Sequence, residues 1–373
     1  MRICFLAPAN SIHTIKWVNA FAEKNYEVHL LTIHTPDIKA LHPKIKVHKL
    51  LFHAPVGYYL NALQGKRLLN KIKPDLFHVH YASGYGTLGR LINFHPMILS
   101  VWGSDVFEFP YQSRFKEKTL KRNLQSADQI LSTSYSMKIQ TEKFLKPETD
   151  IRVTPFGVDT TKFKRYEQKE SLDNSITIGM IKLLEPIYGA KYLIEAFAKV
   201  LTDIGNNDEN NTINLKLLFV GDGSGREALE QMVGKKGIQK HVEFVGAVPN
   251  DQVPLWLNRI DVFCAPSLSE SFGVAVIEAS ACETPVVVSN VGGLPEVVID
   301  EVTGFIVEPK HVEQLAEKIL ILVNDQSLRK QMGAAGRKFV LENYAWEKNV
   351  GTMESIYIET VTNKGSMSNV GVE

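Results

Sequence analysis

The sequence predicts an α/β protein made of two doubly wound domains, each built on a parallel sheet. Three observations lead to this prediction. The chain has 373 residues, which is too many for one compact core of ordinary size. Short apolar runs alternate with amphipathic helical patterns, as they do in parallel sheets with crossover helices. The alternation lapses in the polar stretch 164–175 and then restarts, so two such units are expected.

The strands and helices are read from these runs in chain order. In the first half we expect strands at 3–6, 28–32, 76–80 and 97–101, with a helix at 15–24 between the first two. In the second half we expect strands at 176–180, 216–220, 242–244, 262–265 and 285–289. The helices between them are expected at 191–203, 225–236, 274–282, 311–323 and 327–343, with a loop at 205–211.

The domain boundaries follow from the same pattern. An N-terminal domain is expected over 1–165 and a C-terminal domain over 166–345. An amphipathic helix over 346–362 is expected to pack back on the N-terminal domain, and residues 363–373 form a flexible tail. Parallel sheets bind ligands at the carboxyl ends of their strands. Two domains that face each other across a cleft would therefore place the functional site in that cleft.

The composition is that of a globular protein, with 44% hydrophobic and 22% charged residues. Cys4, Cys264 and Cys282 stand singly in apolar runs, so we expect buried thiols in a reducing compartment. The first residues look like a strand, and no apolar run approaches the ~18 residues that a spanning helix needs. These features predict a cytoplasmic protein.

The net charge of +1 conceals an asymmetry between the two halves. Residues 1–165 hold 24 Lys and Arg against 12 Asp and Glu, a balance of +12, whereas residues 166–373 hold 18 against 29, a balance of −11. A strongly basic half suggests an anionic partner, although drift in surface composition is the alternative. The basic stretch 113–124 carries five cations with Phe115, Leu120 and Leu124 between them. It is predicted to lie on an anionic membrane, or else to be a solvated helix face; no nucleic-acid partner is expected.

Two glutamates, Glu270 and Glu278, bracket an apolar run in the second half. Ser271 is expected to cap a helix that begins near Phe272, which leaves Glu270 in the loop and Glu278 in the helix. The first amides of such a helix favour an anion, and Gly273 permits close approach of the backbone. Carboxylates repel a phosphate but accept hydrogen bonds from sugar hydroxyls. The pattern therefore favours a hydroxyl clamp over an acid/base pair, although a capping acid remains an alternative for Glu270.

The Glu-x7-Glu spacing within 266–279 resembles the signature of the retaining nucleotide-sugar glycosyltransferases of family 4, which have the GT-B fold. Further matching motifs lie at 219–223, 244–248, 281–287, 291–298 and 303–307, and the resemblance covers essentially the whole chain. It implies that the N-terminal domain binds an acceptor and the C-terminal domain binds a nucleotide sugar. The nucleotide sugar would be a substrate, so no cofactor is expected.

The resemblance also implies roles for individual residues. Glu278 would accept hydrogen bonds from the ribose hydroxyls of the donor, and Glu270 would contact the donor sugar. The other implied donor contacts are the amides of Phe272, Gly273 and Val274, close approach at Gly223, and the region of the base at Val248.

A cation must meet the charge that develops on the leaving diphosphate. The chain has no Asp-x-Asp motif, so no metal is expected and the cation must be a side chain. The family usually supplies an Arg and, about six residues later, a Lys. Here Lys182 and Tyr188 occupy these two places, so Lys182 is the expected phosphate-stabilising residue and Tyr188 departs from the two-cation pattern.

The N-terminal half supplies candidate acceptor or sugar contacts. His13 lies in the expected loop after the first strand, and either a polar contact or a capping or core role fits it. His78 and His80 share one face of a strand, where they pack or where His80 reaches the cleft. The stretch 100–106 resembles the His-Gly-Ser-Asp motif of the family, with Trp102 in place of His. Trp102 could offer a ring face to a sugar, and Asp105 either acts on an acceptor hydroxyl or caps a helix.

The resemblance implies a retaining, front-face transfer of a hexosyl or N-acetylhexosaminyl group that needs no metal. The acceptor is expected to be a lipid-linked or cell-envelope glycan, as in polysaccharide biosynthesis at the inner face of the membrane. The alternative enzyme is a nucleotide-sugar epimerase of the same architecture. The alternative without catalysis is a sugar-binding subunit.

Overall fold

The computed structural model describes residues 1–166, 175–207 and 214–369, and it divides into two compact units. Met1–Pro155 forms the first unit together with Asn349–Glu373, and Phe156–Lys348 forms the second. The boundary precedes the expected one at 165/166 because the chain from Phe156 onward pairs with the second unit. There the Phe156 ring packs on Phe272, and Val158 bridges to Ala345. Parts of the stretches 164–175 and 205–211 lie outside the described residues.

The described part of the first unit contains a seven-stranded, fully parallel sheet with the order β3-β2-β1-β4-β5-β6-β7. The predictions of β1, β2, β4 and β5 are confirmed, whereas β3, β6 and β7 were not predicted. The strands are β1 (Arg2–Leu6), β2 (Glu27–Thr32), β3 (Lys46–Lys49), β4 (Leu76–His80), β5 (Met97–Val101), β6 (Gln129–Ser132) and β7 (Ile151–Val153).

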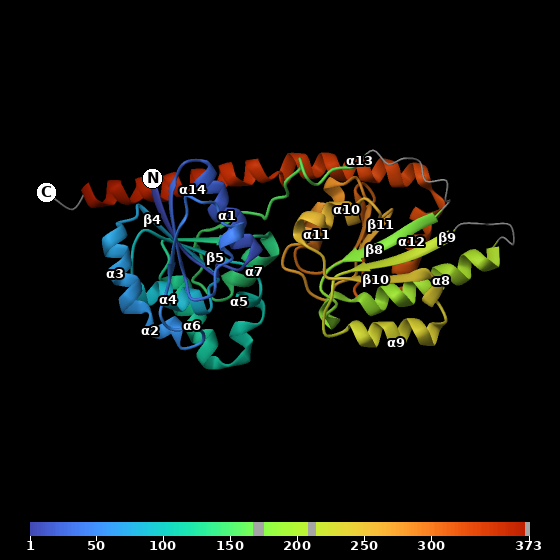
Figure 1. The fold of residues 1–373 in the computed structure, drawn as a ribbon, viewed down its shortest axis with the longest axis horizontal. Helices are drawn as coiled ribbons and strands as arrows, with labels where there is room; N and C mark the ends of the chain where they lie inside the picture. The colour runs from blue at the N-terminus through green and yellow to red at the C-terminus, as the bar shows by residue number, and fades with distance from the viewer. Residues whose placement is uncertain (167–174, 208–213, 370–373) are drawn as a thin grey trace. The chain divides into compact units, whose positions relative to one another are not determined.

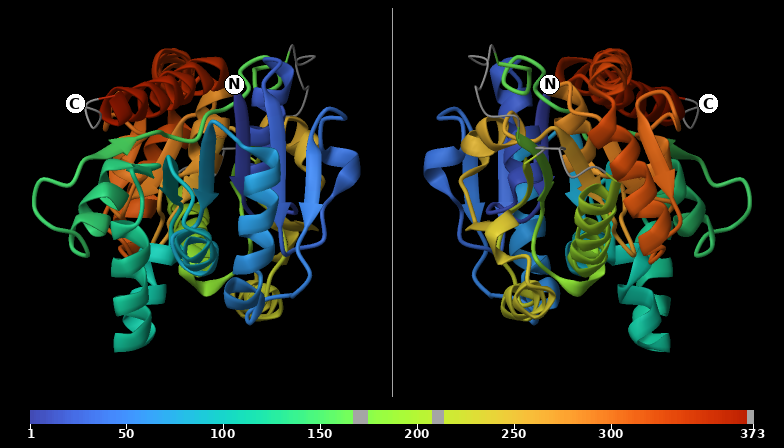
Figure 2. Two further views of the ribbon diagram at one scale, coloured as in Figure 1. Left: turned by 90° about the vertical axis from the view of Figure 1, so that its left-hand side faces the viewer. Right: turned by 90° about the vertical axis from the view of Figure 1, so that its right-hand side faces the viewer.

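Helices cover both faces of this sheet (Figures 1 and 2). One face carries α1 (Ile12–Glu23) and α14 (Trp346–Asn369), and the other carries α3 (Ala62–Ile72), α4 (Gly84–Ile92) and α6 (Arg114–Gln125). The remaining helices are α2 (Gly57–Leu60), α5 (Ser104–Phe107), α7 (Tyr135–Glu142) and the 3-10 turns η1 (Ile38–Ala40) and η2 (Phe109–Gln112).

Helix α6 does not present the apolar surface that the sequence suggested. Leu120 and Leu124 are buried and belong to the core between the helices and the sheet, and of the three apolar side chains expected outside only Phe115 is exposed. The helix therefore packs its apolar stripe against its own sheet, so Leu120 and Leu124 are not available to a membrane.

The second unit has, in its described residues, a six-stranded parallel sheet with the order β10-β9-β8-β11-β12-β13. The five expected strands are confirmed, and β13 was not predicted. The strands are β8 (Ser175–Ile181), β9 (Asn214–Val220), β10 (Val242–Gly246), β11 (Val262–Ala265), β12 (Val286–Ser289) and β13 (Gly304–Val307).

All five helices expected in the second unit are present, and α10 and the short turns were not predicted. The elements are α8 (Ala190–Asn207), α9 (Arg226–Lys236), α10 (Val253–Leu257), α11 (Val274–Ala281), α12 (Val312–Asn324), α13 (Gln326–Asn343), η3 (Pro186–Tyr188), η4 (Gln239–His241), η5 (Asn250–Gln252) and η6 (Leu294–Glu296). Helices α8, α9 and α12 bury a common core against the sheet, and α11 packs beside α13.

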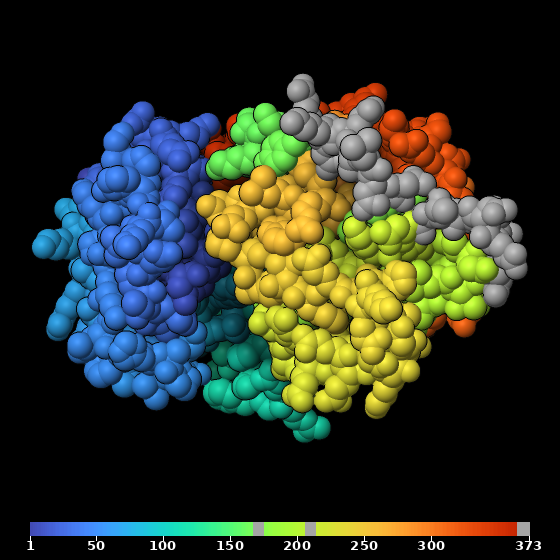
Figure 3. All heavy atoms as spheres, turned by 45° about the vertical axis from the view of Figure 1, so that its right-hand side comes forward, coloured from blue at the N-terminus to red at the C-terminus, as the bar shows by residue number. Residues whose placement is uncertain are grey.

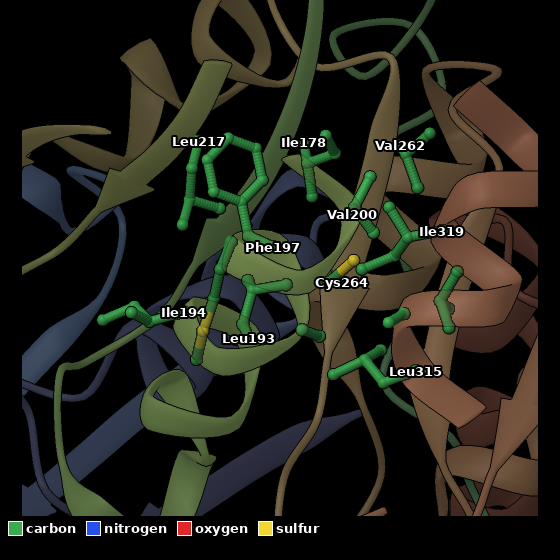
Figure 4. Close-up of a cluster of buried hydrophobic side chains, with 14 of the residues drawn as sticks. Ile178, Leu193, Ile194, Phe197, Val200, Leu217, Val262, Cys264, Leu315 and Ile319 are labelled. Carbon is green, nitrogen blue, oxygen red and sulfur yellow. The ribbon is translucent and has the colours of Figure 1, made fainter. Parts of the chain in front are cut away.

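Figure 4 shows the centre of this core. Phe197 of α8 lies near Ile178 of β8, and Ile319 of α12 lies near Cys264 of β11. All of these side chains are buried, as apolar groups must be for the sheet and its helices to hold together. Cys264, like Cys4 and Cys282, is a buried free thiol, which confirms the interpretation of the cysteines as buried thiols.

Both sheets reverse their strand order at one place. The crossovers run outward from β1 to β3 and then return to β4 beside β1; in the second sheet they run from β8 to β10 and return to β11 beside β8. A doubly wound sheet leaves a crevice at such a switch point, at the carboxyl ends of the two strands. The residues that follow β1, β4, β8 and β11 are therefore the best placed for binding.

Helix α14 fastens the end of the chain to the first unit. The ring of Tyr357 is fully buried and stacks on Phe21 of α1, with 4.7 Å between ring centroids. Its hydroxyl forms a hydrogen bond with Nδ1 of His78 in β4. Burial lowers the pKa of His78 to about 3, so this imidazole is neutral. The helix continues to Asn369, so the tail expected from residue 363 begins as helix.

We expect Tyr357→Phe to cost about 1–3 kcal/mol in the free energy of unfolding, because it leaves a buried imidazole nitrogen without its partner. Tyr26→Phe is the matched control, since the Tyr26 hydroxyl also binds α14, through Glu354, but at a site that water reaches. The control should cost less than about 1 kcal/mol. Equal losses in urea titrations of the two variants would contradict this account of the helix.

Candidate active site

The site in the second unit is centred on an ion pair at the switch point. Lys182 follows β8 and Glu270 lies in the loop after β11, and these strands are neighbours in the sheet. The Lys182 Nζ lies 2.6 Å from Glu270 Oε2. The lysine and glutamate side chains are 25% and 13% exposed, so the pair is largely withdrawn from solvent. Such a pair is stronger than one on the surface, where water screens the charges.

Tyr188 completes this cluster. The Lys182 Nζ lies 4.5 Å from the centroid of the Tyr188 ring, which is a cation–π contact. The ring is partly buried and packs against the core of the unit. The residue that replaces the second cation of the family pattern thus contacts the first one.

The loops around the cluster are fixed to one another. The Leu268 N–H donates to the carbonyl of Ile187 at 2.8 Å, which joins the loop after β11 to the turn that carries Tyr188. Gly189 has φ +73°, and a Cβ there would lie 1.9 Å from the carbonyl oxygen of Pro266. Only glycine fits a backbone approach this close.

A second glycine turn contacts the backbone of Glu270. The Gly293 N–H donates to the carbonyl of Glu270 at 3.0 Å. Gly292 has φ +53°, and a Cβ there would lie 1.8 Å from the same carbonyl oxygen. This Gly-Gly turn lies within the motif at 291–298, but its contact with Glu270 is a feature that sequence reasoning missed.

The helix that carries Glu278 begins where the 274–282 pattern predicts, but not at the start that capping by Ser271 implied. Helix α11 starts at Val274, and its N-cap is Gly273 with φ +106°. The expectation that Ser271 caps a helix starting near Phe272 is therefore wrong. The side chain of Phe272 is buried against the rings of Phe156 and Tyr344, which keeps this residue out of the helix.

The donor-binding residues implied by the resemblance differ in how far they are buried. Glu278 is buried within α11, 6% exposed, and Gly273 lines a small cavity with Lys182 and Glu270. The cavity holds about 10 Å³, room for about one water molecule.

Gly223 and Val248 lie in loops beyond this cavity. A Cβ at Gly223 would lie 2.9 Å from the backbone of Leu184, so its missing side chain makes room for the protein's own loop. Val248 is half-buried and follows the edge strand β10.

The first unit brings three predicted contact residues together near its own switch point. Trp102 lies after β5, and the centroid of its ring is 4.3 Å from that of His80 at the end of β4 and 5.9 Å from that of His13 in α1. His13 lies in the first turn of α1, where a loop was expected. Trp102 is only 7% exposed and therefore offers little ring face to a sugar.

His80 is fully enclosed at this place. Its Nδ1 lies 3.4 Å from the hydroxyl of Thr14, and burial lowers its pKa well below the usual value, so it is neutral. This position favours the packed strand end over the alternative in which His80 reaches a cleft.

Asp105 is bound by the backbone of two loops. Its carboxylate is buried and accepts hydrogen bonds from the backbone N–H groups of Ala82, Trp102 and Gly103. Burial raises its pKa, while these bonds act in the opposite direction. The carboxylate thereby ties the loop after β4 to the loop after β5, an arrangement that favours a positioning role.

Metal ligands and membrane spans were also sought in the structure. Within the described ranges no group of three or more His, Cys, Asp or Glu could hold a metal ion. In the same part of the chain, no helix is both long and apolar enough to cross a bilayer.

Comparison with known proteins identifies the class. The family profile described as "Glycosyl transferases group 1" matches residues 162–339, and the one described as "Glycosyl transferase 4-like" matches residues 2–134. An uncharacterized glycosyltransferase of Methanocaldococcus jannaschii is 30% identical over 348 residues, which cover 90% of this chain and 91% of that protein. The chain belongs to the group 1 glycosyltransferases, and its two parallel sheets have the GT-B fold.

Two further proteins are similar to this chain, one in sequence and one in fold. The N-acetyl-alpha-D-glucosaminyl L-malate synthase of Bacillus anthracis is 27% identical over 368 residues, 91% of each chain. The solved structure of Anabaena HepE in complex with UDP matches with a TM-score of 0.82 over 96% of this chain and 100% of that one. Its sequence identity of 18% shows a shared fold.

The glycine turn behind Glu270 gives a direct test of the site's construction. We expect Gly292→Ala to destabilise the protein by at least about 2 kcal/mol more than Gly237→Ala. Gly237 also has positive φ, +70°, but a Cβ there meets nothing within 4 Å, so this control isolates the strain of the left-handed backbone. Similar free energies of unfolding for the two variants would show that the Gly292 turn yields without cost.

Proposed function

We propose that this glycosyltransferase transfers a hexosyl or N-acetylhexosaminyl group from a nucleotide sugar to a lipid-linked or cell-envelope glycan, with retention of configuration. The observation that carries the proposal is the cluster of Lys182, Glu270 and Tyr188 at the carboxyl ends of β8 and β11. It sets one cation and one carboxylate at the switch point of a doubly wound sheet, where such sheets bind ligands.

Lys182 is the group that stabilises departure of the nucleoside diphosphate. As the bond from the sugar to the β-phosphate breaks, negative charge grows on the phosphate oxygens, and an ammonium already in place lowers the barrier. The ring of Tyr188 holds this ammonium from one side without adding a second charge. The charge is met by this side chain, so the transfer needs no divalent metal.

Glu270 and Glu278 act as acceptors for hydroxyl groups of the donor. In the free protein Glu270 is occupied by Lys182, so both side chains must exchange partners when a donor binds. Lys182 then turns to the diphosphate and Glu270 accepts hydrogen bonds from the sugar. Glu278, one turn into α11, accepts from the ribose, and the amides at the start of α11 face the diphosphate.

Retention follows a front-face route. The acceptor hydroxyl attacks from the side that the leaving group vacates, and a phosphate oxygen of the leaving diphosphate takes the proton of that hydroxyl. An α-linked donor therefore yields an α-linked product. Asp105 is not required as a base, because its oxygens are already committed to backbone amides.

The donor can be identified by thermal stabilisation. A ligand that binds only the native state raises the melting temperature, so among UDP-, GDP- and ADP-sugars the true donor should shift it most. Incubation of that donor with a lipid-linked glycan acceptor should give an α-linked product by NMR, at a rate that EDTA leaves unchanged. Conversion of the donor without any acceptor would indicate an epimerase instead, and a β-linked product would exclude retention.

The ion pair predicts that two substitutions change the affinity for the nucleoside diphosphate in opposite directions. Lys182→Ala should weaken binding of the free nucleoside diphosphate at least about tenfold and lower turnover about a hundredfold or more. Glu270→Gln removes the competitor for the ammonium, so the same diphosphate should bind about fivefold more tightly while transfer slows. Titration calorimetry and initial rates measure both effects. Weaker diphosphate binding in Glu270→Gln, or unchanged turnover in Lys182→Ala, would contradict this mechanism.

A further inference from the structure

The first unit exposes a group of large apolar side chains in one short segment. Between residues 51 and 63, six of them have exposed fractions from 41% to 71%. We call them the apolar surface; it consists of Leu51, Phe52, Val56, Tyr59, Leu60 and Leu63. They lie in the loop after β3, in α2 and at the start of α3 (Figure 1). Figure 3 shows blue atoms of this N-terminal part of the chain at the surface of the unit.

The backbone beneath the apolar surface is held by a buried polar residue. The side chain of Asn61 is fully buried; it accepts a hydrogen bond from the Phe52 N–H at 3.0 Å and donates to the carbonyls of Phe52 and Gly57 at 2.8 and 2.9 Å. The Leu51 N–H donates to the side chain of Gln64 at 3.0 Å. The exposure of these apolar groups therefore belongs to a defined conformation and does not come from a loose loop.

Charge of a single sign flanks the apolar surface along the chain. From residue 38 to residue 74 the chain contains eight Lys and Arg and no Asp or Glu. Four of these cations, Lys66, Arg67, Lys71 and Lys73, follow the apolar surface along and just after α3, and all four are exposed. Apolar side chains flanked by cations are the combination that binds at the boundary between the headgroups and acyl chains of an anionic bilayer.

Two alternatives to a lipid surface fit these residues less well: a second copy of the chain, and no partner at all. A second copy of the chain would bring the same cations against each other, and like charges oppose such an interface. A solvent-exposed apolar cluster without a partner would favour aggregation. An anionic lipid surface satisfies both requirements at once, because it accepts the apolar groups and neutralises the cations.

We propose that residues 51–73 dock this protein onto an anionic lipid surface, with the apolar surface inserted among the lipids and the exposed cations of α3 on their phosphates. The docking site is distinct from α6, whose leucines are committed to the core. The link between docking and catalysis rests on the proposed function, because an enzyme held at a bilayer would meet a lipid-linked acceptor there. Docking itself does not depend on which sugar or nucleotide is used.

Co-sedimentation of the full chain with vesicles tests the proposal. The protein should bind vesicles of phosphatidylcholine with 30% phosphatidylglycerol at least tenfold more tightly than vesicles of phosphatidylcholine alone, and 0.5 M NaCl should weaken the binding. The double variant Leu60→Glu with Leu63→Glu should lose at least tenfold in partition. Both positions are exposed, so the fold should survive, as circular dichroism will verify.

Phe115→Glu is the matched control, since Phe115 is an exposed apolar residue of the same unit on α6. It should retain vesicle binding close to that of the unchanged protein. Equal loss in Phe115→Glu and in the double variant would overturn the proposal, as would the absence of binding to anionic vesicles at low salt. A dimer in sedimentation velocity that the double variant dissociates would also overturn it, in favour of a self-interface.

Thermal stabilisation by nucleotide sugars separates this inference from the proposed function. The double variant should keep the nucleotide-induced shift of the unchanged protein while it loses vesicle binding. Vesicle binding without any nucleotide-induced shift in the unchanged protein would leave the docking surface standing and remove the proposed donor chemistry. A nucleotide-induced shift without vesicle binding would remove the docking surface and leave the proposed donor chemistry standing.

Discussion

The ion pair between Lys182 and Glu270 is the contact on which the architecture of the site depends. The two residues are 88 positions apart in the chain, and they meet because the crossovers return β11 to the side of β8. Two glycine turns then contact the loop closely, Gly189 at Pro266 and Gly292 at Glu270 itself. The sheet order brings the charges together, and the close backbone contacts fix the distance between them.

Much of the fold could be predicted from the sequence because the buried strands are short apolar runs. Two of the strands that were missed, β3 and β7, depart from this pattern, whereas β6 and β13 follow it. In β3 the sequence Lys-Val-His-Lys is polar and lies at the edge of the sheet, and β7 has only three residues. Edge strands bury fewer side chains than central ones, so hydrophobic periodicity gives little sign of them.

The site was predictable in its components but not in its contacts. The spacing of Glu270 and Glu278 and the exchange of a cation for Tyr188 are visible in the sequence. The stacking of Lys182 on that tyrosine requires the turn at 186–189, which tertiary contacts hold in place. The misplaced start of α11 has a similar cause, because Ser271 is a good capping residue locally while the burial of Phe272 delays the helix to Val274.

The two surfaces considered for membrane contact show why exposure has to be established in the structure. Leucines four residues apart on α6 look amphipathic, and the sequence does not say whether their stripe faces lipid or the protein's own sheet; here it faces the sheet. In the segment 51–63, Val56, Tyr59, Leu60 and Leu63 also have helical spacing, but here the apolar side chains are exposed, on a backbone that the buried amide of Asn61 holds. The same helical spacing thus accompanies a buried stripe on α6 and an exposed one at 56–63, and only the tertiary contacts tell the two apart.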